Sequence, residues 1–166
     1  MSVVLSLCGE AALSPFRIEK LLQQAAKLQL NCEIQINSEY RYFVASSAKI
    51  TSDNQQKLLQ LLRARPQSSH KLSETQLLII PRLGTISPWS SKATDIARNC
   101  GLSMIERIER GILYSFSRQL SQQELDKWQT ILHDRMTESV LTSEKEAIKT
   151  FSYLISTELQ LYRRTS

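Results

Sequence analysis

Leu13-Ser14-Pro15-Phe16 and Ile86-Ser87-Pro88-Trp89 share one order of residue types: apolar, serine, proline, aromatic. The serine of each tetrad is suited to cap a helix, and the proline is suited to the first helical position. An apolar stretch typical of a buried strand comes before each tetrad, at Val3 to Cys8 and at Leu77 to Ile80. The two tetrads therefore indicate two similar halves, each opening with a strand and a serine-capped helix.

The chain after each of these helices predicts a hairpin and then a second helix. Apolar and polar residues alternate on both sides of a polar turn, which is typical of paired strands. The expected strands are Cys32 to Ile36 and Tyr40 to Val44 around Asn37 to Glu39, and Ile105 to Arg107 and Ile112 to Phe116 around Glu109-Arg110-Gly111. Ser52-Asp53-Asn54-Gln55 and Ser121-Gln122-Gln123-Glu124 have the form of capping boxes, and each opens a helix with an apolar stripe.

The predicted fold class is α/β in the broad sense, more narrowly α+β, built from a duplicated strand-helix-strand-strand-helix unit. The sheets are expected to be mainly antiparallel, with helices packed on one face. A repeat of about seventy residues is too long for a solenoid unit and suits a duplicated small domain. We expect one domain over residues 1–140, with halves at about 1–66 and 75–140. Residues 141–166 are expected to form a helical tail or the start of a linker, with Phe151, Leu154, Ile155 and Leu159 on its apolar side.

Composition limits the class of protein more than its function. The 166 residues suit a single globular domain, and the net charge of +5 is spread along the chain without a basic run. Cys8, Cys32 and Cys100 lie far apart and lack metal-ligand spacing, which is typical of reduced thiols. No stretch reaches the roughly 18 apolar residues of a membrane span, so we expect a soluble, cytoplasmic protein without a membrane partner.

The stretch from Pro81 to Asp95 is the most informative for chemistry. It leaves a buried strand, turns at Gly84 and enters a helix N-terminus, bringing many hydroxyls together with Arg82 and Lys92. Free backbone N–H groups at a helix start favour anions, so one interpretation is a phosphate site. In the other interpretation Ser87 only caps the helix, Lys92 pairs with Asp95, and Trp89 packs in the core.

No pair of nucleophile and base emerges from the sequence. His70 lies in a polar loop, and His133 lies near a helix end, where a cation suits the helix dipole. Glu124, Asp126 and Asp134 have basic neighbours and indicate a solvated face. The cysteines are expected to pack inward as small apolar groups. We predict no catalytic residue and no metal ligand in this chain.

A family resemblance lies in the same stretch. Arg82 to Ala97, followed by Asn99-Cys100-Gly101-Leu102, closely resembles the N-terminal signature of the large, single-chain phosphoribosylformylglycinamidine synthases. Leu13 to Arg17 and Leu132 to Glu138 are similar to two further landmarks of that family, so the resemblance covers about residues 3 to 140. These enzymes are ATP- and glutamine-dependent ligases of purine biosynthesis.

The resemblance implies that the two halves are similar to a fused pair of the small accessory subunit found in multi-subunit versions of the enzyme. It implies a docking and coupling domain that contacts the synthetase and glutaminase domains, with ATP and magnesium held in the synthetase domain. No catalytic residue of the family carries over to this chain. The positions that carry over as candidate interface or anion-binding residues are Arg82, Thr85, Ser87, Trp89, Ser90, Ser91, Lys92 and Asp95.

Two other functions remain open from the sequence. A basic nucleic-acid-binding module is one, with Tyr40-Arg41-Tyr42-Phe43 as its weak candidate strand. The other is a stand-alone domain that binds a phosphate ligand through the loop from Arg82 to Lys92. Surface normally covered by partner domains also predicts self-association of the isolated chain.

Overall fold

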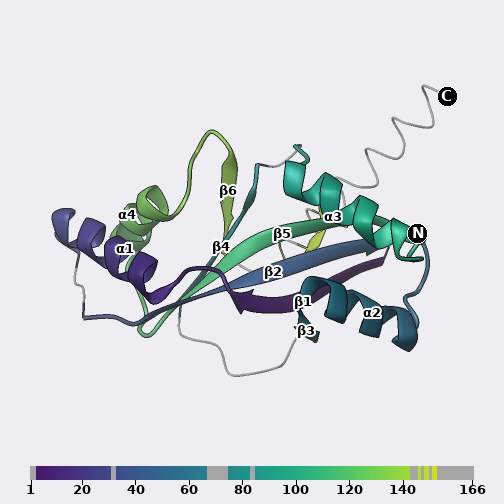
Figure 1. Ribbon diagram of the computed structural model, residues 1–166. Coiled ribbons are helices and arrows are strands. Elements are labelled where there is room, and N and C mark those ends of the chain that lie inside the picture. The colour runs from purple at the N-terminus through teal and green to yellow at the C-terminus, as the bar shows by residue number, and fades with distance from the viewer. Residues whose placement is uncertain are drawn as a thin grey trace.

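The computed structural model describes residues 3–30, 33–66, 75–82 and 85–142, and residues 146, 148, 149, 151 and 152 beyond them. Each helix lies between two strands along the chain (Figure 1). In order they are β1 (Val3–Ala11), α1 (Pro15–Lys27), β2 (Ile36–Ser46), α2 (Ser52–Leu62), β3 (Arg65–Pro66), β4 (Thr75–Pro81), α3 (Pro88–Asn99), β5 (Ile105–Phe116), α4 (Gln122–Leu132) and β6 (Glu138–Leu141).

The six strands form one antiparallel sheet in the order β3-β1-β2-β5-β4-β6. The predicted α+β class is confirmed, as are the antiparallel pairing and the helices on one face. Outward from the central β2–β5 pair, the two sides of the sheet have the same order of strands. In each half the long strand (β2 or β5) is central, the first strand (β1 or β4) lies next to it, and the short last strand (β3 or β6) is at the edge. This symmetry concerns the strand order, and duplication of the sequence stays a prediction.

Both predicted hairpins are wrong. β2 runs unbroken through Asn37 to Glu39, and β5 runs unbroken through Glu109-Arg110-Gly111. The polar residues that resemble turns find partners outside their strand: Ser38 Oγ, for example, accepts a hydrogen bond from the Leu13 backbone N–H at 3.0 Å. Each half is therefore strand, helix, strand, helix, strand, and the short strands β3 and β6 were not predicted.

The helix starts agree with the sequence, with one shift. Ser14 and Ser87 cap α1 and α3 with proline at the first position, and Ser121 forms the complete capping box of α4. In α2 the cap is Thr51, one residue before the predicted box, and its hydroxyl accepts from the Asn54 N–H at 3.3 Å. Short polar side chains thus satisfy a free N–H at all four starts.

The helices cover the ends of one sheet face in two pairs (Figure 1). At one end α1 and α4 enclose a core with Ala25, Trp128 and the β5 residue Phe116. At the other end α2 and α3 pack Leu58 and Ala97 against the sheet. The middle of the sheet face lies between these pairs. The stretch from Pro81 to Asp95, called the signature stretch below, begins next to it.

The opposite sheet face has its own apolar cluster. It contains Phe43, Leu78, Leu113, Leu141 and Phe151. Phe151 is buried, as its predicted place on an apolar helix side requires. Leu154, Ile155 and Leu159 lie outside the described residues.

Candidate functional site

The start of the signature stretch is held by hydrogen bonds of Arg82 and Thr85. The Arg82 N–H donates to the Thr137 carbonyl at 2.8 Å. The Thr85 N–H and hydroxyl both donate to the Arg82 carbonyl, at 3.1 and 2.6 Å. Leu83 and Gly84 lie outside the described residues. The stretch is thereby anchored to the segment before β6, next to the start of α3.

Ser87 does more than the predicted capping. Its Oγ accepts from the Ser90 N–H at 3.0 Å and donates to Glu109 Oε1 at 2.9 Å. Glu109 also accepts from the Arg107 guanidinium at 2.9 Å and from the Arg110 backbone N–H at 3.0 Å. The Glu109 side chain is only 5% exposed, so this carboxylate is a buried and well-bonded group.

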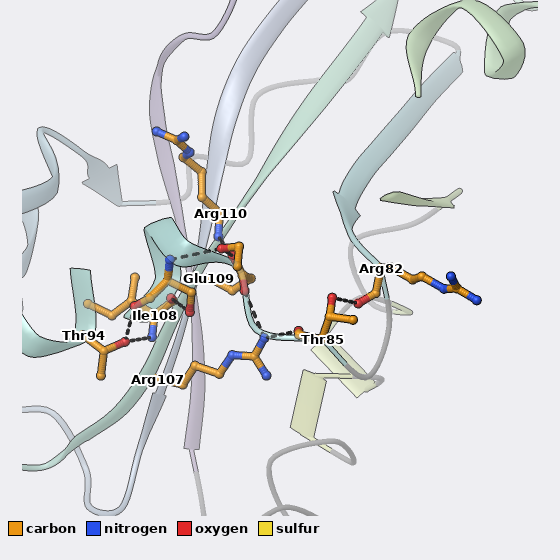
Figure 2. A network of polar contacts seen from close by, with 9 residues as sticks. Arg82, Thr85, Thr94, Arg107, Ile108, Glu109 and Arg110 are labelled. Atoms are coloured by element: carbon orange, nitrogen blue, oxygen red, sulfur yellow. Dashed lines mark hydrogen bonds and ion pairs between the residues drawn. The ribbon is translucent and has the colours of Figure 1, made fainter. Parts of the chain in front are cut away.

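Two hydroxyls of α3 form hydrogen bonds to the backbone of β5, in the part of β5 that does not pair with β4. Pairing of β4 with β5 extends only to Ile112, which leaves the backbone of Ile108 without a strand partner on that side. Ser90 Oγ donates to the Ile108 carbonyl at 2.5 Å, and Thr94 Oγ1 accepts from the Ile108 N–H at 3.0 Å (Figure 2). Both hydroxyls are buried, so their role is to hold the helix on the sheet.

The remaining candidates lie on the outside. Arg82, Thr85, Ser91, Lys92 and Asp95 are all exposed. Figure 2 shows the Arg82 side chain pointing away from the network around Glu109. The predicted Lys92–Asp95 ion pair is wrong, because within the described part of the chain neither side chain has an ion-pair partner. The stretch therefore has a bonded inner side and an open outer side.

Trp89 belongs to an aromatic group that also holds Arg110. Its ring stacks on Tyr42 with centroids 5.8 Å apart. The Arg110 guanidinium carbon lies 4.5 Å from the Trp89 ring and 4.5 Å from the Tyr40 ring. Burial raises the pKa of Tyr42, although the nearby Arg110 charge opposes the shift. Trp89 is half-buried and packs against the apolar cluster under α2 and α3, as one interpretation of the sequence predicted.

Close approach of the strands below this group requires glycine. An ideal Cβ on Gly9 would lie 2.6 Å from Tyr42 Cε2 and 2.9 Å from Tyr40 Cβ. One on Gly111 would lie 2.8 Å from the Ile79 carbonyl oxygen. Side chains at either position would displace the tyrosines or β4.

Two hollows flank Trp89. One is an apolar groove of about 330 Å³ between α2 and α3, lined by Leu61, Leu62, Trp89, Lys92, Ala93 and Ile96. The other is a cavity of about 220 Å³ over the middle of the sheet, where Trp89 and Ser87 meet Tyr40, Arg110 and Glu138. Glu109, Arg110 and Glu138 were not predicted as site residues, because the first two looked like part of a turn.

The other candidates for chemistry have structural surroundings. His133 caps the C-terminus of α4, with its ring Nδ1 against the Gln129 carbonyl, and His70 lies outside the described residues. Cys8 is buried and accepts from Arg41 at 2.7 Å, whereas Cys100 is exposed, contrary to the inward packing predicted for it. Cys32 is not among the described residues. Over the ranges that the structure describes, no group of His, Cys, Asp and Glu is arranged to hold a metal ion.

The strand proposed for nucleic-acid binding is internal. Arg41, Tyr42 and Phe43 are 5%, 6% and 2% exposed, so their side chains are not available to stack on bases. Arg41 contacts Glu39 at 2.6 Å. None of the helices in the described part of the chain is long and apolar enough to cross a bilayer.

Comparison with protein-family models identifies the chain. Residues 39–151 match the family described as formylglycinamide ribonucleotide amidotransferase N-terminal. The chain belongs to this family. The match begins inside β2, at Glu39, ends at Phe151, and contains the whole signature stretch with its partners on β5. The protein is thus an N-terminal domain of the purine-biosynthesis amidotransferase, as the signature from Arg82 to Ala97 indicated.

Proposed function

We propose that this amidotransferase N-terminal domain is a non-catalytic docking and coupling module. It holds the synthetase and glutaminase domains of the same enzyme in register, and ATP and magnesium bind in the synthetase domain. The proposed accessory domain extends over about residues 1–140, and residues after 140 are either a helical tail or the start of a linker to the next domain.

The observation that carries this proposal is the two-sided signature stretch. The hydroxyls of Ser87, Ser90 and Thr94 form hydrogen bonds to Glu109 and to the backbone of β5. These bonds on the inner side fix the position of the start of α3. Arg82, Lys92 and Asp95 are exposed and have no ion-pair partner within the described residues. Charged groups held on a rigid element beside an apolar groove are typical of a surface that selects a partner.

Turnover measurements test the absence of catalysis. The chain alone is expected to give no ammonia-dependent or glutamine-dependent synthesis of formylglycinamidine ribonucleotide. The synthetase and glutaminase domains, expressed without this domain, are expected to regain glutamine-dependent synthesis when the chain is added. Synthesis by the chain alone would refute the proposal.

A charge reversal tests the docking surface. Lys92→Glu is expected to weaken binding of the chain to the synthetase domain at least about tenfold, because it introduces a like or unmatched charge at the contact. Lys49→Glu is the matched control, since Lys49 is exposed in the loop between β2 and α2. Equal affinities for both variants would place the interface elsewhere.

A further inference from the structure

The cavity over the middle of the sheet has walls from four strands and from the start of α3. Tyr40 comes from β2, Arg110 and Ile112 from β5, Ile79 from β4, and Glu138 from β6. Its volume of about 220 Å³ is below the roughly 300–1,000 Å³ of pockets for drug-sized ligands. It therefore suits a small metabolite with few non-hydrogen atoms.

Arg110 supplies an available positive charge on one wall. Its guanidinium lies against the Tyr40 and Trp89 rings at 4.5 Å and makes no ion pair within the described residues. Figure 2 shows the side chain extending away from the Glu109 carboxylate, which is occupied by Arg107 and Ser87. Stacking fixes the plane of the guanidinium, so its fork of donors is preorganised for a planar carboxylate.

Glu138 supplies a negative charge in the same cavity. One of its carboxylate oxygens accepts from the Asp134 backbone N–H at 3.0 Å, and no cation pairs with it in the described part of the chain. This charge acts on Tyr114 in β5. Burial, and after it the nearby Glu138 carboxylate, raises the pKa of Tyr114 to about 12. Glu138 and Arg110 line one cavity without forming an ion pair of 4.0 Å or less.

Two unpaired opposite charges on the walls of one small cavity restrict its ligand. A phosphate would meet a single unpaired cation and be repelled by Glu138, and a simple amine would be repelled by Arg110. A molecule with one negative and one positive group satisfies both walls. We propose that this cavity binds a free amino acid as its zwitterion, with the α-carboxylate on Arg110 and the α-ammonium group on Glu138.

The site is a property of this domain alone and does not depend on docking. Isothermal titration calorimetry of the chain with each common L-amino acid is expected to find a binder with Kd at or below about 1 mM. Capping its amine by acetylation, or its carboxylate as the amide, is expected to weaken binding at least about tenfold. Inorganic phosphate is expected to give no binding heat.

Two variants assign the two contacts. Glu138→Gln is expected to weaken binding of the free amino acid about tenfold while leaving the acetylated form almost unchanged. Arg110→Gln is expected to weaken binding of the free amino acid about tenfold while leaving binding of the amide almost unchanged. Arg110→Lys, which keeps the charge and loses the fork, serves if Arg110→Gln lowers the unfolding midpoint.

Three results would overturn the assignment. One is the absence of binding heat with every amino acid at about 10 mM, and another is equal binding of free and capped forms. The third is a loss in either variant that is the same for all ligands. None of these bears on whether the chain binds the synthetase domain, so failure here and failure of the docking proposal are separate outcomes.

Discussion

Helices α1 and α3 begin alike and serve different purposes. Both have a serine cap and a proline at the first position, followed by Phe16 in α1 and Trp89 in α3. Phe16 is 63% exposed, with the Lys20 ammonium 4.6 Å from its ring, whereas Trp89 stacks on Tyr42 and Arg110. The shared tetrad determines where a helix starts, and the residues that follow it determine what the helix does.

The difference extends to how each helix meets the sheet. α1 packs through apolar side chains such as Ile18 and Leu22. α3 hydrogen-bonds through Ser90 and Thr94 to the backbone of β5, and its cap bonds the buried Glu109. Polar contacts of this kind depend on direction more than apolar packing does, so α3 is the more precisely positioned helix.

The largest expected effect lies at Glu109. Glu109→Gln is expected to lower the free energy of unfolding by about 3–5 kcal/mol, because the buried Arg107 guanidinium loses the carboxylate it contacts at 2.9 Å. Glu39→Gln is the comparison in the first half, where the carboxylate paired with Arg41 is 25% exposed. Urea unfolding measures both. A loss at Glu109 no greater than at Glu39 would contradict the account of the second half.

A smaller loss is expected at Thr94. Thr94→Val keeps the shape of the side chain but leaves the buried Ile108 N–H without its acceptor, at a cost of about 1–3 kcal/mol. Thr130→Val on α4 is the matched control, because Thr130 is exposed and its hydroxyl donates to the Lys127 carbonyl of its own helix. Denaturant midpoints that shift equally for both variants would show that the Thr94 hydroxyl does not secure α3.

The two serine caps allow a direct comparison of the helices. Ser14→Ala is expected to cost about 1 kcal/mol, the usual value of a lost N-cap. Ser87→Ala is expected to cost more, because it also removes the 2.9 Å bond to Glu109. Thermal unfolding of both variants measures the difference, and equal losses would mean that the Ser87–Glu109 bond adds nothing.

The smallest effect is expected at the surface pair of Arg118 and Glu124. The hydrogen bond from Arg118, with Ser121, lowers the pKa of Glu124 from 4.5 to about 2. A lowered pKa in the folded state stabilises the protein above pH 4.5, and this contribution is lost as the pH falls toward 2. For a partly exposed pair it amounts to about 0.2–1 kcal/mol.

Urea unfolding at several pH values measures this contribution. The stability difference between the parent chain and Glu124→Gln is expected to shrink between pH 4.5 and pH 2. A difference that stays constant over that interval would contradict the lowered pKa of Glu124.

The sequence predicted the parts of the fold that depend on local signals. The patterns at Ser14, Ser87 and Ser121 that predict a helix start each lie within three or four residues. All three serines are N-caps in the structure. The unbroken strands were missed because Ser38 and Glu109 look like turn residues until their partners are known. Those partners, Leu13 and Ser87, lie 25 and 22 residues away, and no local pattern contains them.

The candidate site was predicted in part for the same reason. The resemblance located the stretch from Arg82 to Asp95, but it gave no distinction between the inward Ser90 and the outward Lys92. Arg110 and Glu138 are brought to one cavity by strand pairing of β5 with β4 and of β4 with β6. Only the order of strands in the sheet reveals that they line the same cavity.

The most direct test of the central claim compares the two sides of α3 in one binding measurement. The affinity of the chain for the synthetase domain is determined for the parent chain, for Lys92→Glu on the outer side and for Thr94→Val on the inner side. We expect Lys92→Glu to lose affinity about tenfold or more without a change in stability, and Thr94→Val to lose stability while keeping its affinity below its unfolding midpoint. Unchanged affinity in Lys92→Glu, or no binding by the parent chain, would contradict the docking proposal.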